Sequence, residues 1–221
     1  RHLVEHGLPG QKNFWENLGD ASFTALPMCA FALMLIGHLN GLQRRLYLQA
    51  TRDVLTGLAN RRCFMDKTPE HIVPDDAVMI IDVDCFKDIN DSFGHDVGDR
   101  CLLEIAQHLS GCIAEGDLHA RIGGEEFAVF IPRADEDRLH RIATMISGGI
   151  DFDAGQGVMR RVSLSVGIGR HSETGPRHDA LRLADQAVYQ AKAAGRARYR
   201  MLTGAQRDQS GADYPVAVPA T

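Results

Sequence analysis

The sequence has no block of basic residues. Its 24 lysines and arginines are outnumbered by 29 aspartates and glutamates, so the formal net charge at pH 7 is −5. A protein that binds nucleic acid through the phosphates needs a basic patch that follows them. We therefore do not expect nucleic acid among the partners.

The sequence also lacks paired cysteines. None of its five cysteines stands in a CxxC arrangement, and most occur in apolar contexts. This usage is typical of buried free thiols in a reducing compartment, and it argues against a metal site built from cysteine. The residues are Cys29, Cys63, Cys85, Cys101 and Cys112.

Charged side chains are absent from residues 21–43. A helix rising about 1.5 Å per residue would span roughly 34 Å over this stretch, and the hydrocarbon core of a bilayer is about 30 Å thick. Aromatic residues precede the stretch and arginines follow it, as in a membrane span with a cytoplasmic basic end. A helix buried against a partner is the alternative, because the stretch contains a proline, a histidine and an asparagine. A cleaved signal peptide would have its basic residues before the apolar run.

A leucine seam leaves this apolar stretch. Leu35, Leu39, Leu42 and Leu46 are spaced four, three and four residues apart, as in the a and d positions of a coiled coil. A stripe this short also fits a packed helix face. Its place between an expected membrane span and an expected soluble domain favours a parallel dimer stalk as a hypothesis.

After Thr51 the apolar pattern changes between strand and helix spacing. Strands are predicted at 76–84, 118–124, 125–132, 161–170 and 197–202, and helices at 97–113, 135–150 and 177–196. Gly195 is expected to end the last helix in a left-handed conformation. The order is that of a βαββαβ, ferredoxin-like core. We therefore predict an α+β fold, an antiparallel sheet with helices on one face.

Four acidic residues are expected to meet at one edge of this sheet. Asp82 and Asp84 come at the exposed end of the first predicted strand. Glu125 and Glu126 begin the third, which lies beside the first in such a sheet. Carboxylates without matching cationic side chains repel one another unless a cation is present, and oxygen ligands suit Mg²⁺. From this turn alone, a hairpin with exposed glutamates on its rim is the simpler interpretation.

Polar residues suited to a nucleotide follow the first predicted strand. An asparagine and an aspartate can together recognise guanine, because the carboxylate accepts the N1–H and N2–H donors. A lysine there would offset the charge of a phosphate. The residues are Lys87, Asn90, Asp91, His95 and Asp99. Each alone fits helix capping or a solvated loop, whereas the set favours a nucleotide site.

Five blocks of the sequence resemble the GGDEF-domain diguanylate cyclases, here spelled GGEEF. The blocks are DVLTGLANRRCF, DVDCFKDINDSFGHDVGD, RIGGEEF, SLSVGIG and ADQAVYQAKAAGR, between Asp53 and about Arg200. The resemblance implies a domain that condenses two GTP molecules into cyclic di-GMP and releases pyrophosphate. It implies the palm-like sheet of polymerases and nucleotidyl cyclases. Because one domain holds one GTP, it also implies a homodimer, in which an upstream stalk raises the effective concentration of half-sites.

The resemblance further implies roles for individual residues. Asp82, Glu125 and the carbonyl of Val83 would bind Mg²⁺, with Mn²⁺ as an alternative. Glu125 would also deprotonate the 3′-hydroxyl. Two further residues complete the implied catalytic set: Lys87 would stabilise the transition state, and Glu126 would have a supporting role. The implied substrate contacts are Asn90 and Asp99 at guanine, His95, Gly123 and Gly124 near the nucleotide, and Lys192 and Arg196 at the terminal phosphates. The role of Asp84 is left open.

One feature of the family is incomplete here. Many members carry an inhibitory product site, RxxD, just before the paired glycines, and this sequence reads AEGD, with Ala114 in place of arginine and Asp117 retained. Arginine is the residue best suited to bidentate contacts with phosphate or guanine. We therefore expect weak product inhibition, through the active site alone. A catalytically silent domain that binds GTP or cyclic di-GMP is the alternative, but intact acids beside a broken product site favour the enzyme.

These inferences divide the chain into four parts. Residues 1–20 are predicted to be an extracytoplasmic or linker segment, 21–50 a transmembrane helix and dimer stalk, 51–203 the GGDEF domain, and 204–221 a disordered tail. The expected location is the inner (cytoplasmic) membrane, with the catalytic domain in the cytoplasm. Because the chain begins with Arg1 and not Met, we expect an upstream part that carries the sensor.

Overall fold

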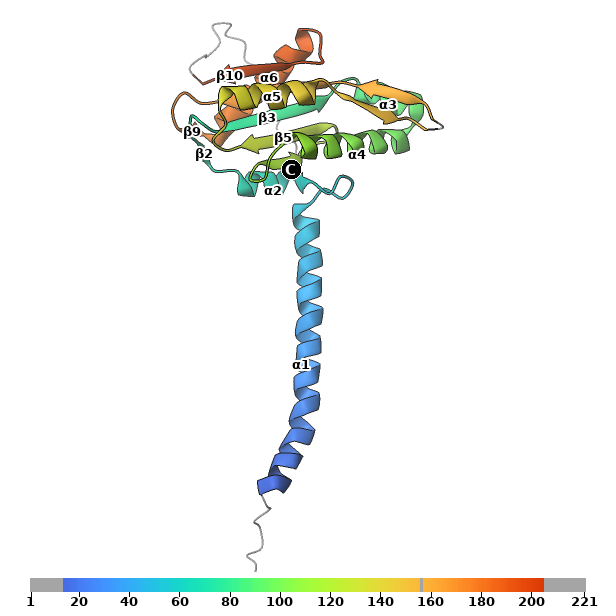
Figure 1. Ribbon diagram of the computed structural model, residues 1–221, viewed down its shortest axis with the longest axis vertical. Helices are drawn as coiled ribbons and strands as arrows, with labels where there is room; N and C mark the ends of the chain where they lie inside the picture. Colours follow the sequence, from blue (N-terminus) through green and yellow to red (C-terminus); the bar gives the residue numbers. More distant parts are fainter. Residues whose placement is uncertain (1–13, 156, 205–221) are drawn as a thin grey trace, which may run out of the picture. The chain divides into compact units, whose positions relative to one another are not determined.

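The computed structural model describes residues 14–155 and 157–204, with side chains from residue 25 onward. The chain divides into two compact units, Arg1–Leu48 and Gln49–Thr221, which can be followed by colour in Figure 1. Most of the predicted tail, from residue 205 on, and residues 1–13 of the predicted N-terminal segment lie outside the described residues. Those two predictions therefore stay predictions.

Helix α1 (Phe14–Thr51) extends beyond the predicted segment 21–50 at both ends and contains Pro27 in its interior. Its part Ala25–Thr51 is long and apolar enough to cross a membrane, by length and composition. The seam leucines are exposed, from 45% at Leu35 to 57% at Leu46. The described part of this chain therefore does not cover the seam.

The second unit is built on a six-stranded sheet in the order β1-β4-β5-β3-β8-β10. The strands are β1 (Ala59–Asn60), β3 (Ala77–Val83), β4 (Leu118–Arg121), β5 (Glu126–Ile131), β8 (Leu164–Arg170) and β10 (Tyr199–Thr203). The central strand β3 is antiparallel to both β5 and β8, which confirms the predicted α+β core and its neighbouring strands. The outer strands β1 and β10 run parallel to their neighbours, so the sheet is mixed at its edges and not wholly antiparallel.

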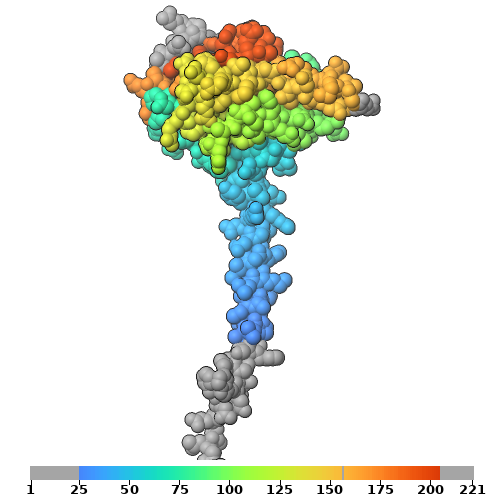
Figure 2. Space-filling model, in the orientation of Figure 1, coloured from blue at the N-terminus to red at the C-terminus, as the bar shows by residue number. Residues whose placement is uncertain are grey.

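Helices cover both faces of the sheet, and the prediction of helices on one face is wrong. The helices of this unit are α2 (Arg61–Lys67), α3 (Phe86–Phe93), α4 (His95–Cys112), α5 (Glu136–Ser147) and α6 (Arg177–Ala193). On one face α4 and α5 share a core cluster with Met79 and Ile81 of β3; both helices lie side by side on the surface in Figure 2, coloured green and yellow. On the other face α2 and α6 pack with Val78 and Ile80. A strand buried on both faces is apolar throughout, as β3 is, and shows no alternation.

Helix α6 lies close to the sheet because β8 carries glycines beneath it. A Cβ at Gly167 would lie 2.0 Å from the carbonyl oxygen of Ala184, and one at Gly169 would lie 2.0 Å from that of Ala180. Successive side chains of a strand alternate between faces, so Asp82 shares the α6 face with Val78 and Ile80. The close packing therefore brings the end of α6 over the acidic end of β3.

Two small sheets complete this unit. Strands β2 (His71–Ile72) and β9 (Gly175–Pro176) pair, as do β6 (Ile150–Asp153) and β7 (Met159–Val162). The strand predicted at 161–170 is thus two strands in different sheets, divided at Ser163. All five cysteines are free, but Cys29 and Cys85 are exposed, so burial was wrongly predicted for these two.

Candidate active site

The predicted convergence of β3 and β5 occurs at the turn that carries the paired glycines. The ladder pairs Asp82 with Glu126, and the N–H of Val83 donates to the carbonyl oxygen of Glu125 at 3.2 Å. The glycines have ordinary negative φ angles. A Cβ at Gly123 would collide with the Glu126 carboxylate at 2.4 Å, whereas one at Gly124 would meet no atom within 4 Å. A side chain at 123 would therefore have to displace the Glu126 carboxylate, and the turn leaves open space beside Gly124.

Arg121 holds this turn, and sequence reasoning gave it no role. Its Nη2 donates to the carbonyl oxygen of Gly124 at 2.7 Å, and its Nη1 donates to Asp53 Oδ1 at 3.1 Å. Asp53 also accepts from the N–H and hydroxyl of Thr56, at 2.8 and 2.7 Å. Burial acts to raise the pKa of Asp53, but the hydrogen bonds from Thr56 and Arg121 outweigh it and hold that pKa below its ordinary value. The available signal was the position of Arg121, two residues before the paired glycines.

Asp82 is buried and faces Lys192. Its side chain is 10% exposed, and its Oδ1 lies 2.7 Å from Lys192 Nζ at the end of α6. Burial and the nearby charge of Asp84 raise the pKa of Asp82, while the lysine opposes that rise. Burial also raises the pKa of Glu125, and the charge of Asp82 adds to the effect. The positive charge of Lys192 therefore does not bring the pKa of either carboxyl group back to its ordinary value.

The donors at this site fit a hard divalent cation. Among the described residues no group of three histidine, cysteine or acidic side chains is placed to hold a metal. The predicted set needs only two carboxylates, Asp82 and Glu125, together with the carbonyl of Val83. Mg²⁺ binds through few carboxylates, keeps waters and takes substrate phosphates. The raised pKa values of Asp82 and Glu125 also fit a cation site, because a bound cation would favour the charged forms of both acids.

The structure brings the predicted guanine contacts together at the junction of α3 and α4. Asn90 of α3 lies against Gly98 of α4, where a Cβ would come within 2.0 Å of the Asn90 Oδ1 atom. Asp99 follows Gly98 directly and is exposed. His95 and Lys87 are exposed as well. Sequence reasoning missed Gly98, whose missing side chain lets the two helices approach here.

Asp84 is not at an exposed strand end, and the structure gives it a place that the sequence left open. The residue is 6% exposed. Its carboxylate accepts hydrogen bonds from the hydroxyls of Ser163 and Ser165, both at 2.7 Å, and from the N–H of Ala197 at 3.0 Å. Ala197 belongs to the exposed loop that follows α6 and carries Arg196. Asp82 and Asp84, two residues apart, therefore serve different parts of the site.

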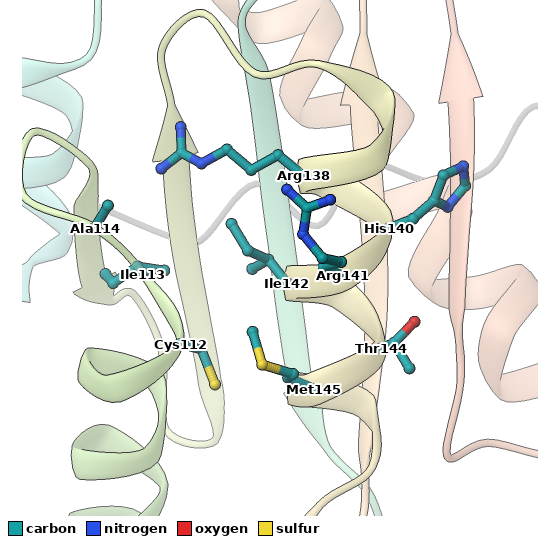
Figure 3. A pocket seen from close by; sticks show the side chains of 9 residues that line it. All are labelled: Cys112, Ile113, Ala114, Arg138, His140, Arg141, Ile142, Thr144 and Met145. Atoms are coloured by element: carbon teal, nitrogen blue, oxygen red, sulfur yellow. The ribbon is translucent and has the colours of Figure 1, made fainter.

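The turn at 114–117 closes on itself. Asp117 accepts from Arg138 Nη2 at 2.6 and 2.9 Å and from the N–H of Ala114 at 2.8 Å, and its side chain is 2% exposed. Figure 3 shows Arg138 reaching from α5 toward this turn, beside a hollow of about 620 Å³. The acid retained from the product motif is thus already paired within the chain.

An acidic pair at the end of a central antiparallel strand, with Lys192 beside it and the charge of Arg196 near enough to lower the pKa of Asp82, suits an enzyme that acts on phosphates through a divalent cation. Residues 50–198 match the family described as "Diguanylate cyclase, GGDEF domain", and the chain belongs to that family.

Named relatives agree with this assignment. The chain is 41% identical over 169 residues to the response regulator PleD of Caulobacter vibrioides, covering 71% of this chain and 37% of PleD. It is 33% identical over 217 residues to the diguanylate cyclase DgcM of Escherichia coli, covering 89% of this chain and 53% of DgcM. The chain therefore spans about two fifths to half of the length of these relatives.

Solved structures show the same fold. The coiled coil and GGDEF domain of DgcB from Caulobacter crescentus, in complex with c-di-GMP, superposes with a TM-score of 0.66 at 25% identity, covering 82% of this chain and all of that one. The diguanylate cyclase SiaD of Pseudomonas aeruginosa, in complex with its activator SiaC, gives a TM-score of 0.59 at 27% identity, covering 85% of this chain and 76% of that one. The predicted α+β fold class and the predicted family are confirmed.

Proposed function

We propose that this chain is a diguanylate cyclase that condenses two GTP molecules into cyclic di-GMP and two pyrophosphates. One observation carries the proposal: buried Asp82 and neighbouring Glu125, both with raised pKa values, lie at the strand end beneath Lys192. Acidic side chains whose pKa values are raised by burial and by neighbouring charges are typical of a functional site. The homologues named as diguanylate cyclases supply the reaction class.

The chemistry follows from where charge develops. Mg²⁺ bound by Asp82, Glu125 and the Val83 carbonyl would neutralise charge on the triphosphate. Glu125 accepts the proton of the 3′-hydroxyl, whose oxygen bonds to the α-phosphorus of the facing nucleotide as the bond to pyrophosphate breaks. Lys192 turns from Asp82 toward the terminal phosphates, joined by Arg196. Lys87 faces the developing charge, while Asn90 and Asp99 select guanine. Each reaction cycle makes two such bonds.

The turn between β4 and β5 has a supporting role in this proposal. Arg121 fixes the carbonyl of Gly124, and through it the position of Glu125, by two hydrogen bonds at 2.7 and 3.2 Å. The open space beside Gly124 suits close approach of phosphate oxygens to the backbone. Glu126, which lies opposite Asp82 in the ladder, adds negative charge that raises the pKa of Glu125.

A dimer is part of the proposal, because one domain presents one nucleotide site. The exposed leucine seam of α1 is the proposed stalk, and Ala25–Thr51 is the proposed anchor in the inner membrane, with the catalytic domain in the cytoplasm. Replacing Leu39 and Leu42 with lysine should lower activity per domain at low protein concentration. The same change at Leu33 and Ile36, which lie off the seam, controls for the cost of charge in lipid. Equal activity of both variants would contradict the stalk.

The decisive experiment is GTP turnover with Mg²⁺, with products separated chromatographically, for the parent and Glu125→Gln. Cyclic di-GMP from the parent, and a loss of at least about a thousandfold in the variant, are expected from removal of a metal ligand and base. Glu136→Gln, an exposed glutamate on α5, is the matched control and should keep parental activity. A folded, dimeric parent that makes no product would support a silent nucleotide-binding module instead.

A further inference from the structure

The loop after α6 has a backbone that its sequence does not favour. Arg196 and Ala197 are consecutive non-glycine residues with φ angles of 59° and 49°, directly after Gly195 at 106°. Left-handed conformations are disfavoured for residues with a Cβ, and they persist where surrounding contacts determine them. The loop must therefore be held by something outside itself.

Asp84 supplies that contact. Its Oδ2 accepts the N–H of Ala197 at 3.0 Å and the hydroxyl of Ser163 at 2.7 Å, while its Oδ1 accepts the hydroxyl of Ser165 at 2.7 Å. The backbone fixes Asp84 in turn, because its N–H donates to the carbonyl oxygen of Ser163 at 3.0 Å. A buried carboxylate with three hydrogen bonds is a rigid anchor, since charge-assisted bonds are the stronger kind.

The neighbouring contacts show what the anchor positions. The N–H of Arg196 donates to the carbonyl oxygen of Ala191 in the last turn of α6, and the N–H of Val166 in β8 donates to the carbonyl oxygen of Arg198, both at 3.0 Å. The loop is thus tied to α6 on one side and to β8 on the other. Between these ties, Asp84 sets the backbone from which the side chain of Arg196 projects.

We propose that Asp84 is a positioning residue for Arg196, and not a ligand of the metal. It would fix the Arg196 side chain where the terminal phosphates of GTP are held. This inference rests on the proposed function, because the phosphate contact of Arg196 belongs to it. In this proposal the two aspartates at the end of β3 have different roles: Asp82 binds the cation, and Asp84 positions Arg196.

The test compares Asp84→Ala, Asp84→Asn, Arg196→Ala and the double variant Asp84→Ala/Arg196→Ala in the full chain, in detergent micelles. KM for GTP should rise about tenfold in Asp84→Ala and in Arg196→Ala, the factor expected for one lost charge-assisted hydrogen bond. The double variant should be no worse than Arg196→Ala, because the anchor acts through the arginine. The Mg²⁺ concentration for half-maximal activity should stay within about twofold, as expected of a residue that is not a ligand. Asp84→Asn should fall between the parent and Asp84→Ala, because its amide oxygen can still accept the N–H of Ala197 but the bond is no longer charge-assisted.

A readout independent of turnover keeps the inference separate from the proposed function. Amide hydrogen exchange at residues 195–198 should accelerate in Asp84→Ala, and less in the milder Ser163→Ala, while β3 stays protected. Unchanged exchange at 195–198 would overturn the positioning role, whatever the activity. An Asp84→Ala variant with an unchanged KM for GTP and a raised Mg²⁺ requirement would also overturn it. If the parent makes no cyclic di-GMP but Asp84→Ala still loosens the loop and weakens GTP binding, the proposed function fails and this inference stands.

Discussion

Two aspartates near opposite ends of the six-stranded sheet have buried side chains, and they differ in how completely they are paired. Asp117, beside β4, accepts two contacts from Arg138 and one from a backbone N–H. Asp82, at the end of β3, has a single lysine partner, and burial raises its pKa. A buried carboxylate that is fully paired stabilises its surroundings, whereas one left underpaired costs stability.

The difference shows which end of the sheet is kept for a ligand. A carboxylate such as Asp117, whose hydrogen bonds are made within the chain, has little capacity left to bind a ligand. Asp82 lies beside Glu125, whose pKa is also raised, so both acids gain when a cation arrives. The underpaired end is therefore the candidate active site, and the paired end is structural.

Matched substitutions at the two aspartates should separate these roles most strongly in activity. Asp82→Asn should lower cyclic di-GMP formation by at least about a thousandfold, because it removes a ligand of the proposed Mg²⁺ site. Asp117→Asn should leave the rate within about threefold, since surface and structural changes away from the site act mainly on stability. Initial rates at saturating GTP and Mg²⁺ measure both. A large rate loss in Asp117→Asn, at a temperature where it is folded, would break the comparison.

The same two variants should shift stability in opposite directions. Asp117→Asn should lose about 2 kcal/mol, from weakening a buried bond to arginine. Asp82→Asn should gain about 1 kcal/mol in the metal-free protein, as substitutions at strained sites commonly do, because it removes a buried charge and Lys192 can turn toward solvent. A shift of 1 kcal/mol corresponds to about 2–4 °C in Tm for a domain of this size. Thermal unfolding in EDTA measures both, and destabilisation by Asp82→Asn would contradict the argument.

The pH dependence has a definite sign. The pKa values of Asp82 and Glu125 are higher in the folded than in the unfolded state, so their contribution to stability is full at low pH and is lost as pH rises through the folded-state values. In the proposed site, protons would compete with Mg²⁺ for the same acids. Mg²⁺ affinity should therefore begin to fall, on acidification, at a higher pH than for ordinary carboxylates. Lys192 lowers both pKa values, so Lys192→Met should move this fall to still higher pH. Calorimetric titration at a series of pH values measures it, and a shift to lower pH would refute the assignment.

The parts of the fold that the sequence predicted are those with long local patterns. Strand β3, helix α4 and helix α6 each show their period within one segment, and the β4–β5 hairpin is signalled by its glycines. The run at 161–170 alternates throughout, yet its first two residues belong to β7, in another sheet. Alternation reports a strand and does not report its partner, so the division at Ser163 could not be predicted.

The candidate site also has a part that the sequence could predict and a part that it could not. Asp82 and Glu125 could be placed together because strand order alone brings them to one edge. Their environment could not be placed, because it depends on contacts between distant residues: Arg121 reaches Asp53, 68 positions away, and Asp84 accepts from Ala197, 113 positions away. Lys192 reaches Asp82 from α6, and the close packing of α6 on the sheet depends on two glycines of β8. No pattern near the aspartates shows that packing.

The smallest expected effect concerns the paired end itself. Added cyclic di-GMP should raise the apparent KM for GTP and leave kcat unchanged, because Ala114 offers no guanidinium to the product. Restoring the arginine with Ala114→Arg should change this by less than about threefold, since Asp117 is already bound by Arg138 and by the N–H of residue 114. The double variant Ala114→Arg/Arg138→Ala, in which Asp117 is released, should gain non-competitive inhibition. Initial rates over a grid of GTP and product concentrations distinguish the two patterns. Strong non-competitive inhibition of the parent would show that the paired end of the sheet still binds a ligand.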